Sequence, residues 1–245
     1  MAQMKTPGVY IIEKNAFPNS VVEVATAIPA FIGHTQFARD GNKDLTGIPF
    51  RISSMAEFHS FFGFAPTLRF GIRPEDSESE DTTNDINVLF PDGSCQLTLP
   101  KTFYALYYNM LLFYANGGGP CYIVSVGDYE HDFKSIDFTN ALLALKKEQE
   151  PTLVVVPEAV YMEEGDCYKV QTAALMHCGN DMKNRFAILD VFNGYKDENG
   201  AVIKSFRENI GSNFLAYCAS YYPWINTSIV TEKDITFYNI EKDSL

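Results

Sequence analysis

The sequence predicts an α/β fold: a mixed sheet with a parallel core flanked by helices, plus an extended N-terminal strand arm. Between residues 100 and 192, continuous apolar runs typical of strands buried on both faces alternate with helical patterns. This alternation implies parallel strands joined by right-handed crossovers. The arm is predicted because residues 6–20 contain no helical signal and favour an extended chain.

The predicted arm occupies residues 1–20 and has an apolar run at its centre. Pro7 fixes its own φ and disfavours helix at the residue before it, and Gly8 permits a turn. A short strand is stable only when its backbone groups pair with an existing sheet edge. The arm therefore either closes its own domain or donates a strand to a neighbouring subunit. The residues that we expect to pair are Pro7, Gly8, Val9, Tyr10, Ile11 and Ile12.

Residues 21–245 are predicted to form one α/β domain. The elements predicted in its first part are strands at residues 21–26 and 30–34 and a helix at residues 55–62. The break between the two strands falls at Ile28-Pro29. Ser53 or Ser54 should cap the helix and Gly63 should end it, because these residue types favour those positions.

An acidic polar stretch over residues 73–87 lacks any apolar period. Its acidic residues are Glu75, Asp76, Glu78, Glu80, Asp81 and Asp85. We expect a solvated insertion on the outer surface, because its charge density resists burial. A calcium loop is disfavoured, since no Gly occupies the sixth position of an alternating Asp ladder.

Helical and strand patterns alternate in the second half of the domain. Predicted helices cover residues 102–114, 138–148, 167–178 and 205–210, and predicted strands cover residues 121–126, 151–157, 185–191 and 214–222. Asn116-Gly117-Gly118-Gly119 separates the first of these helices from the first of these strands. A phosphate-binding loop would instead follow a strand and open a helix, so these glycines indicate a helix end and a tight turn.

Composition disfavours several classes of partner. With 31 acidic and 19 basic residues, the net charge of −12 disfavours binding to nucleic acid or an anionic membrane. The chain lacks the regions of a signal peptide and any apolar run long enough to span a membrane. The five Cys are never spaced as Cys-x-x-Cys and the four His are dispersed. We therefore predict free thiols, no metal site and no cofactor.

Three carboxylates fall at the carboxyl ends of predicted strands, where α/β enzymes place their sites. They are Asp128, Glu158 and Asp190. None belongs to a matched set such as Gly-x-Ser-x-Gly, His-Glu-x-x-His or a Gly-rich loop after a strand. We therefore predict no catalytic residue and expect Glu158 and Asp190 to cap turns. The cluster Tyr221-Tyr222-Pro223-Trp224 favours a core or subunit interface over a ligand-stacking platform.

Five segments in series resemble the tail sheath protein of contractile phages and of related contractile injection systems. They are Thr6-Pro7-Gly8-Val9-Tyr10-Ile11 with Glu13, Ile28-Pro29-Ala30-Phe31-Ile32-Gly33, the helix end from Phe58 to Gly63, Asn116-Gly117-Gly118-Gly119 before Cys121-Tyr122-Ile123-Val124, and Tyr221-Tyr222-Pro223-Trp224. Their order and spacing fit this family along nearly the whole chain. The resemblance is carried by the five segments together.

The resemblance implies a structural subunit and no enzymatic activity. Subunits of this family stack as rings or a helical array around a rigid inner tube, and their arms add strands to sheets of neighbouring subunits. The implied partners are other copies of the chain, the inner tube protein, and baseplate and terminator proteins. Assembly would take place in the cytoplasm, within a virion or phage tail-like particle that can be released. The rigid-body shift of contraction would be absorbed at a hinge formed by Phe17, Pro18, Asn19 and Ser20.

The family usually continues beyond the Tyr-Tyr-Pro-Trp region into a C-terminal domain that this chain, which stops at Leu245, is expected to lack. The chain would then be part of a longer sheath protein or a shortened relative. Two other functions stay open: a baseplate or receptor-binding component of the same particle, and an α/β enzyme of unidentified chemistry.

Overall fold

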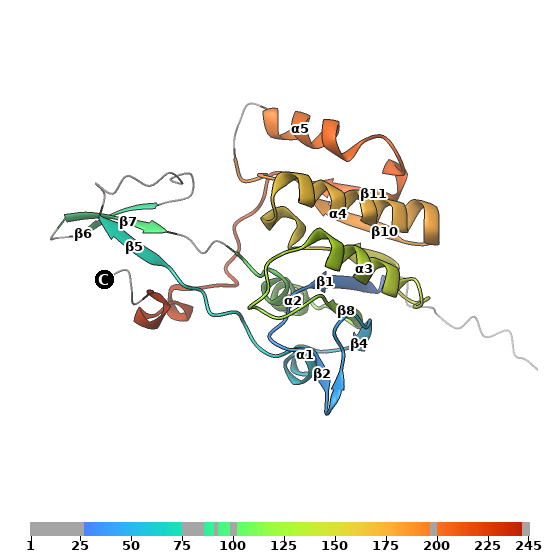
Figure 1. Ribbon diagram of the computed structural model, residues 1–245, viewed down its shortest axis with the longest axis horizontal. Coiled ribbons are helices and arrows are strands. Elements are labelled where there is room, and N and C mark those ends of the chain that lie inside the picture. The colour runs from blue at the N-terminus through green and yellow to red at the C-terminus, as the bar shows by residue number, and fades with distance from the viewer. Residues whose placement is uncertain (1–26, 75–85, 91–92, 99–101, 197–199, 242–245) are drawn as a thin grey trace, which may run out of the picture.

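The structure, a computed structural model, describes residues 27–74, 86–90, 93–98, 102–196 and 200–241 (Figure 1). A six-stranded sheet with helices on both faces forms the main body, and a three-stranded sheet lies apart from it. The predicted mixed α/β fold is therefore confirmed. The predicted arm and hinge of residues 1–20 and the strand of residues 21–26 lie outside the described residues.

The main sheet has the strand order β11-β10-β9-β1-β8-β4. Its strands are β1 (Pro29–Gly33), β4 (Phe50–Ile52), β8 (Cys121–Ser125), β9 (Leu153–Val155), β10 (Phe186–Asp190) and β11 (Cys218–Tyr221). All neighbouring strands are parallel except β4, which runs antiparallel to β8 at the edge. In the central register, Ala30 of β1 lies between Tyr122 and Val154. The predicted parallel core is confirmed.

Five α-helices accompany this sheet in the described residues. They are α1 (Met55–Phe62), α2 (Leu106–Ala115), α3 (Ser135–Leu145), α4 (Glu164–Met176) and α5 (Ala201–Ile210). A π-helical turn, His177–Met182, continues α4, and 3-10 turns cover Ala159–Tyr161, Leu215–Tyr217, Glu232–Asp234 and Phe237–Asn239. A small hairpin pairs β2 (Arg39–Asp40) with β3 (Lys43–Asp44).

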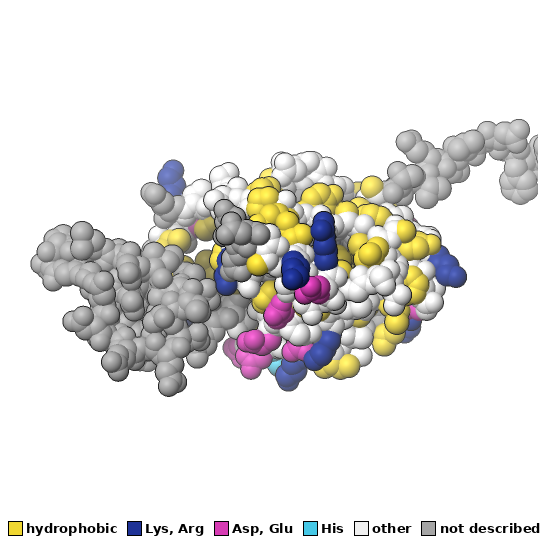
Figure 2. Space-filling model, turned by 90° about the horizontal axis from the view of Figure 1, so that it is seen from above, with side chains coloured by type: hydrophobic (Ala, Val, Ile, Leu, Met, Phe, Trp, Pro, Cys, Tyr) yellow, Lys and Arg dark blue, Asp and Glu magenta, His cyan; other side chains and the backbone are white. Residues whose placement is uncertain are grey.

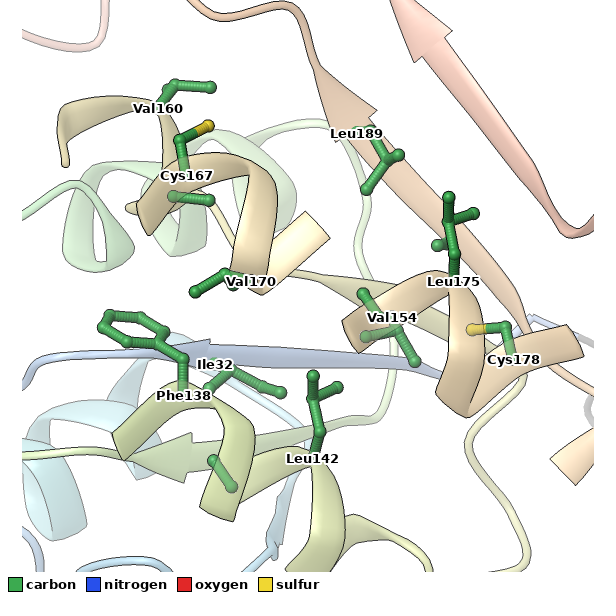
Figure 3. Packing of buried hydrophobic residues seen from close by; sticks show 14 of the residues in the cluster. Ile32, Phe138, Leu142, Val154, Val160, Cys167, Val170, Leu175, Cys178 and Leu189 are labelled. Atoms are coloured by element: carbon green, nitrogen blue, oxygen red, sulfur yellow. The ribbon is translucent and has the colours of Figure 1, made fainter. Parts of the chain in front are cut away.

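Two hydrophobic clusters hold the helices on opposite faces of the sheet. Strand β1 contributes to both clusters because successive side chains point to opposite faces of the sheet. Ala30 and Ile32 belong to the first cluster, under α3, α4 and α5, and Phe31 belongs to the second cluster, under α1 and α2. Figure 3 shows Ile32, Phe138 and Leu142 meeting within the first cluster. Each fully buried side chain of this size contributes about 1.5–3 kcal/mol to folding relative to its exposed state.

One face of the sheet is only partly covered. The residues of β9 and β10 on the side of α3, α4 and α5 are buried, including Val154, Ala187 and Leu189. On the opposite side of β10, Phe186 and Ile188 remain half-buried. Helix α2 lies against β1 and the second cluster, so the residues of β9 and β10 on that side are only half-buried among the described residues.

The small sheet joins β5 (Gly71–Pro74), β7 (Gly93–Thr98) and β6 (Ile86–Phe90), in that order and antiparallel. Both ends of the predicted loop 73–87 are therefore strands, which corrects that prediction, while residues 75–85 lie outside the described residues. Beside it, the Phe70 NH donates to the Asn239 carbonyl at 2.8 Å, and the Glu241 NH donates to the Phe70 carbonyl at 2.9 Å. These bonds tie the C-terminal segment to the base of the small sheet (Figure 1).

The boundaries of the other elements follow local signals. Helix α1 has the predicted bounds, with Ser54 as its N-cap and Gly63 after its last residue. Gly117, at φ 82°, ends α2 as predicted, and the Gly118 NH donates to the Phe113 carbonyl at 2.9 Å. Helix α2 begins at Leu106 and not at residue 102, and the predicted strand 214–222 is a 3-10 turn followed by β11.

Candidate functional site

The strand order marks where a ligand site would be expected. Numbered along the chain, the five parallel strands β1, β8, β9, β10 and β11 lie in the spatial order 2-1-3-4-5, which is that of a doubly wound sheet. Such folds bind ligands beyond the carboxyl ends of the strands at the switch point, here between β1 and β9. The residues that follow Gly33 and Val155 occupy this place.

A buried pair of His34 and Glu158 fills the switch point. The His34 ring Nδ1 lies 2.8 Å from Glu158 Oε2, and the His34 backbone NH donates to the same oxygen at 2.9 Å. The other carboxylate oxygen, Oε1, accepts from the backbone NH of Leu106 at the start of α2, at 3.3 Å. Burial raises the pKa of the Glu158 carboxyl, while the bonds from His34 act in the opposite direction. The prediction that Glu158 caps a turn is thus wrong, because its partners lie in β1 and α2.

Aromatic side chains surround the buried pair of His34 and Glu158. The rings of Tyr104, Phe133 and Phe138 lie within 5.0–5.7 Å of the His34 ring, centroid to centroid. The side chains of His34 and Glu158 are only 1% and 0% exposed. The nearby hydroxyl oxygens of Thr35 and Ser125 lie 2.6 Å apart and are also buried. Because these buried polar groups bond to one another, they form a structural junction at the switch point.

An open site lies a short distance away, at the carboxyl ends of β9, β10 and β11. It is a hollow of about 650 Å³, which we call the aromatic groove. Its walls come from α2 and the residue before it, the turn Ala159–Tyr161, the end of β10 and residues 221–230. The ring-bearing residues of the lining are Phe103, Tyr108, Tyr161, Tyr221, Tyr222 and Trp224. The groove therefore presents mainly apolar and aromatic surface.

Ring contacts and hydrogen bonds fix the walls of the aromatic groove. The Tyr161 ring lies 5.0 Å from that of Phe103 and 5.8 Å from that of Trp224, between centroids. Trp224 is anchored because its indole NH donates to the Val191 carbonyl at 2.9 Å. Trp224 is half-buried and packs against the first hydrophobic cluster, as the core prediction expects, whereas Tyr221 is 59% exposed. The Tyr221–Trp224 cluster forms one wall of the groove, and a role as subunit interface stays a prediction.

Among the described residues that line the aromatic groove, Asp190 is the only charged one. Its side chain is exposed to solvent at the end of β10, and the protein groups that crowd around it raise the pKa of its carboxyl. Among the residues that the structure describes, no Lys, Arg or His forms an ion pair with it, and no hydrogen bond of its carboxylate caps a turn. Its backbone carbonyl accepts from the Gln171 side chain at 2.8 Å. Of the three predicted carboxylates, Asp128 is the one that accepts within its own turn, from the Glu130 NH at 2.9 Å.

A separate polar cluster, formed by Arg185 and His177, is buried at the amino ends of the strands. Arg185 donates to the Leu145 carbonyl at 3.0 Å, to His177 Nε2 at 2.8 Å and to the Glu148 carbonyl. The guanidinium thereby satisfies carbonyls at the C-terminal end of α3. Burial, with Arg185 beside it, lowers the pKa of His177 to about 4. This cluster is structural, because both side chains are almost fully buried.

Other sequence predictions concern metals, thiols and membranes. Cys121, Cys167, Cys178 and Cys218 are free thiols, as predicted, and burial raises the pKa of each. In the described ranges, no cluster of His, Cys, Asp or Glu could hold a metal ion. Within the same ranges, no helix is both long enough and apolar enough to cross a membrane. On the face shown in Figure 2, basic and acidic side chains lie among apolar ones.

Fold and site thus define a doubly wound α/β protein whose switch point is closed and whose open surface is an aromatic groove. Neither the comparison with protein-family models nor the comparison with curated proteins gives a match. The segment predicted to pair with a neighbour, residues 7–12, and the predicted hinge, residues 17–20, both lie outside the described residues.

Proposed function

We propose that the protein is a structural subunit of a contractile sheath, which polymerises around an inner tube and contracts to drive that tube through a target envelope. The observation that carries the proposal is the ordered series of five sheath-like segments from Thr6 to Trp224. Three of these segments form defined parts of the structure: the central strand β1, the turn that ends α2, and one wall of the aromatic groove.

The geometry supports a scaffold role. The switch point, where an α/β enzyme would bind its substrate, is occupied by the buried pair of His34 and Glu158. The open groove is lined by aromatic side chains, which are enriched at protein interfaces. A rigid body with a closed crevice and an open apolar surface suits a subunit that moves as a unit during contraction.

The proposed function implies specific binding partners and a cellular location for assembly. The partners are other copies of the chain, the inner tube protein, and baseplate and terminator proteins. Assembly takes place in the cytoplasm, and the product is part of a virion or phage tail-like particle. The arm of residues 1–20 donates its strand to a neighbouring subunit and the hinge at residues 17–20 absorbs the movement.

Electron microscopy of the purified full chain in negative stain tests this function. We expect rings or long tubes of uniform diameter. A small closed oligomer whose thermal midpoint rises with a small-molecule ligand would instead identify an enzyme. Counting copies in purified particles separates the remaining alternative, because a sheath subunit is the most abundant protein and a baseplate component is present in few copies.

A further inference from the structure

The aromatic groove is an open hollow with a mainly apolar lining. Its volume of about 650 Å³ lies in the range of pockets that hold a ligand or a protein anchor. At its rim, Ile225 is 80% exposed and Tyr221 is 59% exposed. Leaving such side chains in water forgoes the free energy of burying them, so the groove gains from an occupant.

Charge defines the chemistry of that occupant. Asp190 lies in the groove without an ion-pair partner among the described residues, and no basic residue contributes to the lining. The rings of Tyr161 and Trp224 offer faces that attract a cation. A group that fits both features is a lysine side chain, whose apolar stem packs on the rings while its ammonium reaches the carboxylate.

We propose that the aromatic groove binds the N-terminal segment of a second copy of this chain, residues 5–14, with Lys5 or Lys14 directed at Asp190. This segment combines the apolar run Val9–Ile12 with two lysines against one glutamate, so it is positively charged in a chain whose net charge is −12. Its charge and its apolar run are complementary to the lining of the groove.

The place where the chain enters the body and the length of the N-terminal segment are compatible with a second copy as the source. Residue 27 leads into the amino end of β1, whereas the groove lies at the carboxyl ends of β9, β10 and β11, on the opposite edge of the sheet. A segment of 26 residues can extend to roughly 80 Å, which is far enough to reach a neighbouring body. The inference rests on the proposed function, since a polymer supplies the neighbouring copy.

Photo-crosslinking of the full chain tests this docking. The photoreactive amino acid p-benzoylphenylalanine replaces Ile225 in unlabelled protein, which is mixed with ¹⁵N-labelled protein before irradiation and mass spectrometry. We expect crosslinks to residues 5–14 of the labelled copy. The matched control places the same probe at Ile136, an exposed position on α3, where we expect no such crosslink. Crosslinks within one copy, to any other surface, or none at Ile225 would overturn the inference.

Charge variants test the role of Asp190. Asp190→Asn, and separately the double variant Lys5→Gln with Lys14→Gln, should each lower the yield of the Ile225 crosslink about fivefold, the upper end of what one exposed ion pair contributes. Glu208→Gln, an exposed matched control, should leave the yield unchanged. An unchanged yield in both groove variants would overturn the role of the charge pair.

Microscopy of the same samples separates this inference from the proposed function. Polymers without the Ile225 crosslink would overturn the docking site and leave the sheath proposal standing. The crosslink without rings or tubes would overturn the sheath proposal and leave the docking site standing.

Discussion

The buried pair of His34 and Glu158 shows how a single side chain closes the natural site of this fold. A carboxylate with no exposed surface is costly to bury unless its oxygens are hydrogen-bonded. Here both oxygens accept, from His34 on β1 and from the NH of Leu106 on α2. The pair therefore connects β1, the end of β9 and the start of α2 at the centre of the molecule.

Glu158→Ala should destabilise the protein strongly. The change leaves the backbone NH groups of His34 and Leu106 without their acceptor in a buried place, which costs about 3–5 kcal/mol when one partner of a buried pair is removed. Glu158→Gln keeps one acceptor oxygen and should cost less. The free energy of unfolding in urea measures both effects. The control Glu208→Ala, at an exposed residue, should change it by less than about 0.5 kcal/mol. Equal effects at the two positions would contradict this role.

This pair was beyond sequence reasoning for a physical reason. His34 and Glu158 are 124 positions apart, so no local pattern links them, and only the adjacency of β1 and β9 brings them together. The strand ends themselves were predictable, because apolar runs mark the strands. Asp190 was likewise predicted at a strand end, but its lack of a partner depends on how residues 221–230 fold around it.

His177 should make stability depend on pH in the mildly acidic range. Its pKa is lowered to about 4 in the folded protein, against an ordinary value of 6.5 in the unfolded chain. The unfolded state therefore takes up the proton first, so stability is complete above about pH 6.5 and falls as the pH decreases toward 4. The loss attributable to this residue can reach about 3 kcal/mol.

Urea unfolding of the wild type and His177→Gln between pH 7.5 and about 4 isolates this contribution. The variant should show a flatter decline over that window, because it removes the group whose protonation differs between states. Ile136→Gln, at an exposed position without a titratable group, serves as the control and should keep the wild-type slope. Parallel curves for the wild type and His177→Gln would contradict the assignment.

At the level of elements, local chemistry explains which predictions held. Helix α1 has its predicted bounds because Ser54 Oγ accepts from the Glu57 NH at 3.2 Å, and Gly63 takes φ 87° at the other end. The small sheet was missed, although Asp92-Gly93 between two apolar runs is a hairpin signal. Its acidic flank of residues 75–85 dominated the pattern and favoured a loop for the whole region.

The contact between β1 and α2 gives a prediction for Gly33→Ala. A Cβ at this position would lie 2.9 Å from Leu106 Cβ and 3.1 Å from the Glu158 carboxyl carbon, so strand and helix would have to separate. Such overpacking costs about 1–3 kcal/mol. Gly119→Ala is the matched control, because no atom lies within 4 Å of its added Cβ. Urea midpoints should fall for the first variant and stay level for the second, and equal midpoints would contradict the close packing.

For the whole molecule, the described residues form a complete body without the arm. Both hydrophobic clusters and the entire main sheet are built from residues 28–221. In the proposed function, the arm acts by pairing with another subunit. Folding and assembly should therefore separate when the arm is changed.

Deletion of residues 1–20 should leave a folded protein that no longer polymerises. We expect an unchanged circular dichroism spectrum, because the packed clusters persist, and a monomer in sedimentation velocity, because the donated strand is lost. A subtler variant, Ile11→Asp, places a charge in the apolar run and should have the same effect on assembly, since burying an unpaired charge is unfavourable. Its control, Ile11→Val, keeps the β-branched apolar character and should still assemble. Tubes formed by the deletion variant, or loss of its folded spectrum, would show that the arm belongs to its own domain and not to a neighbour.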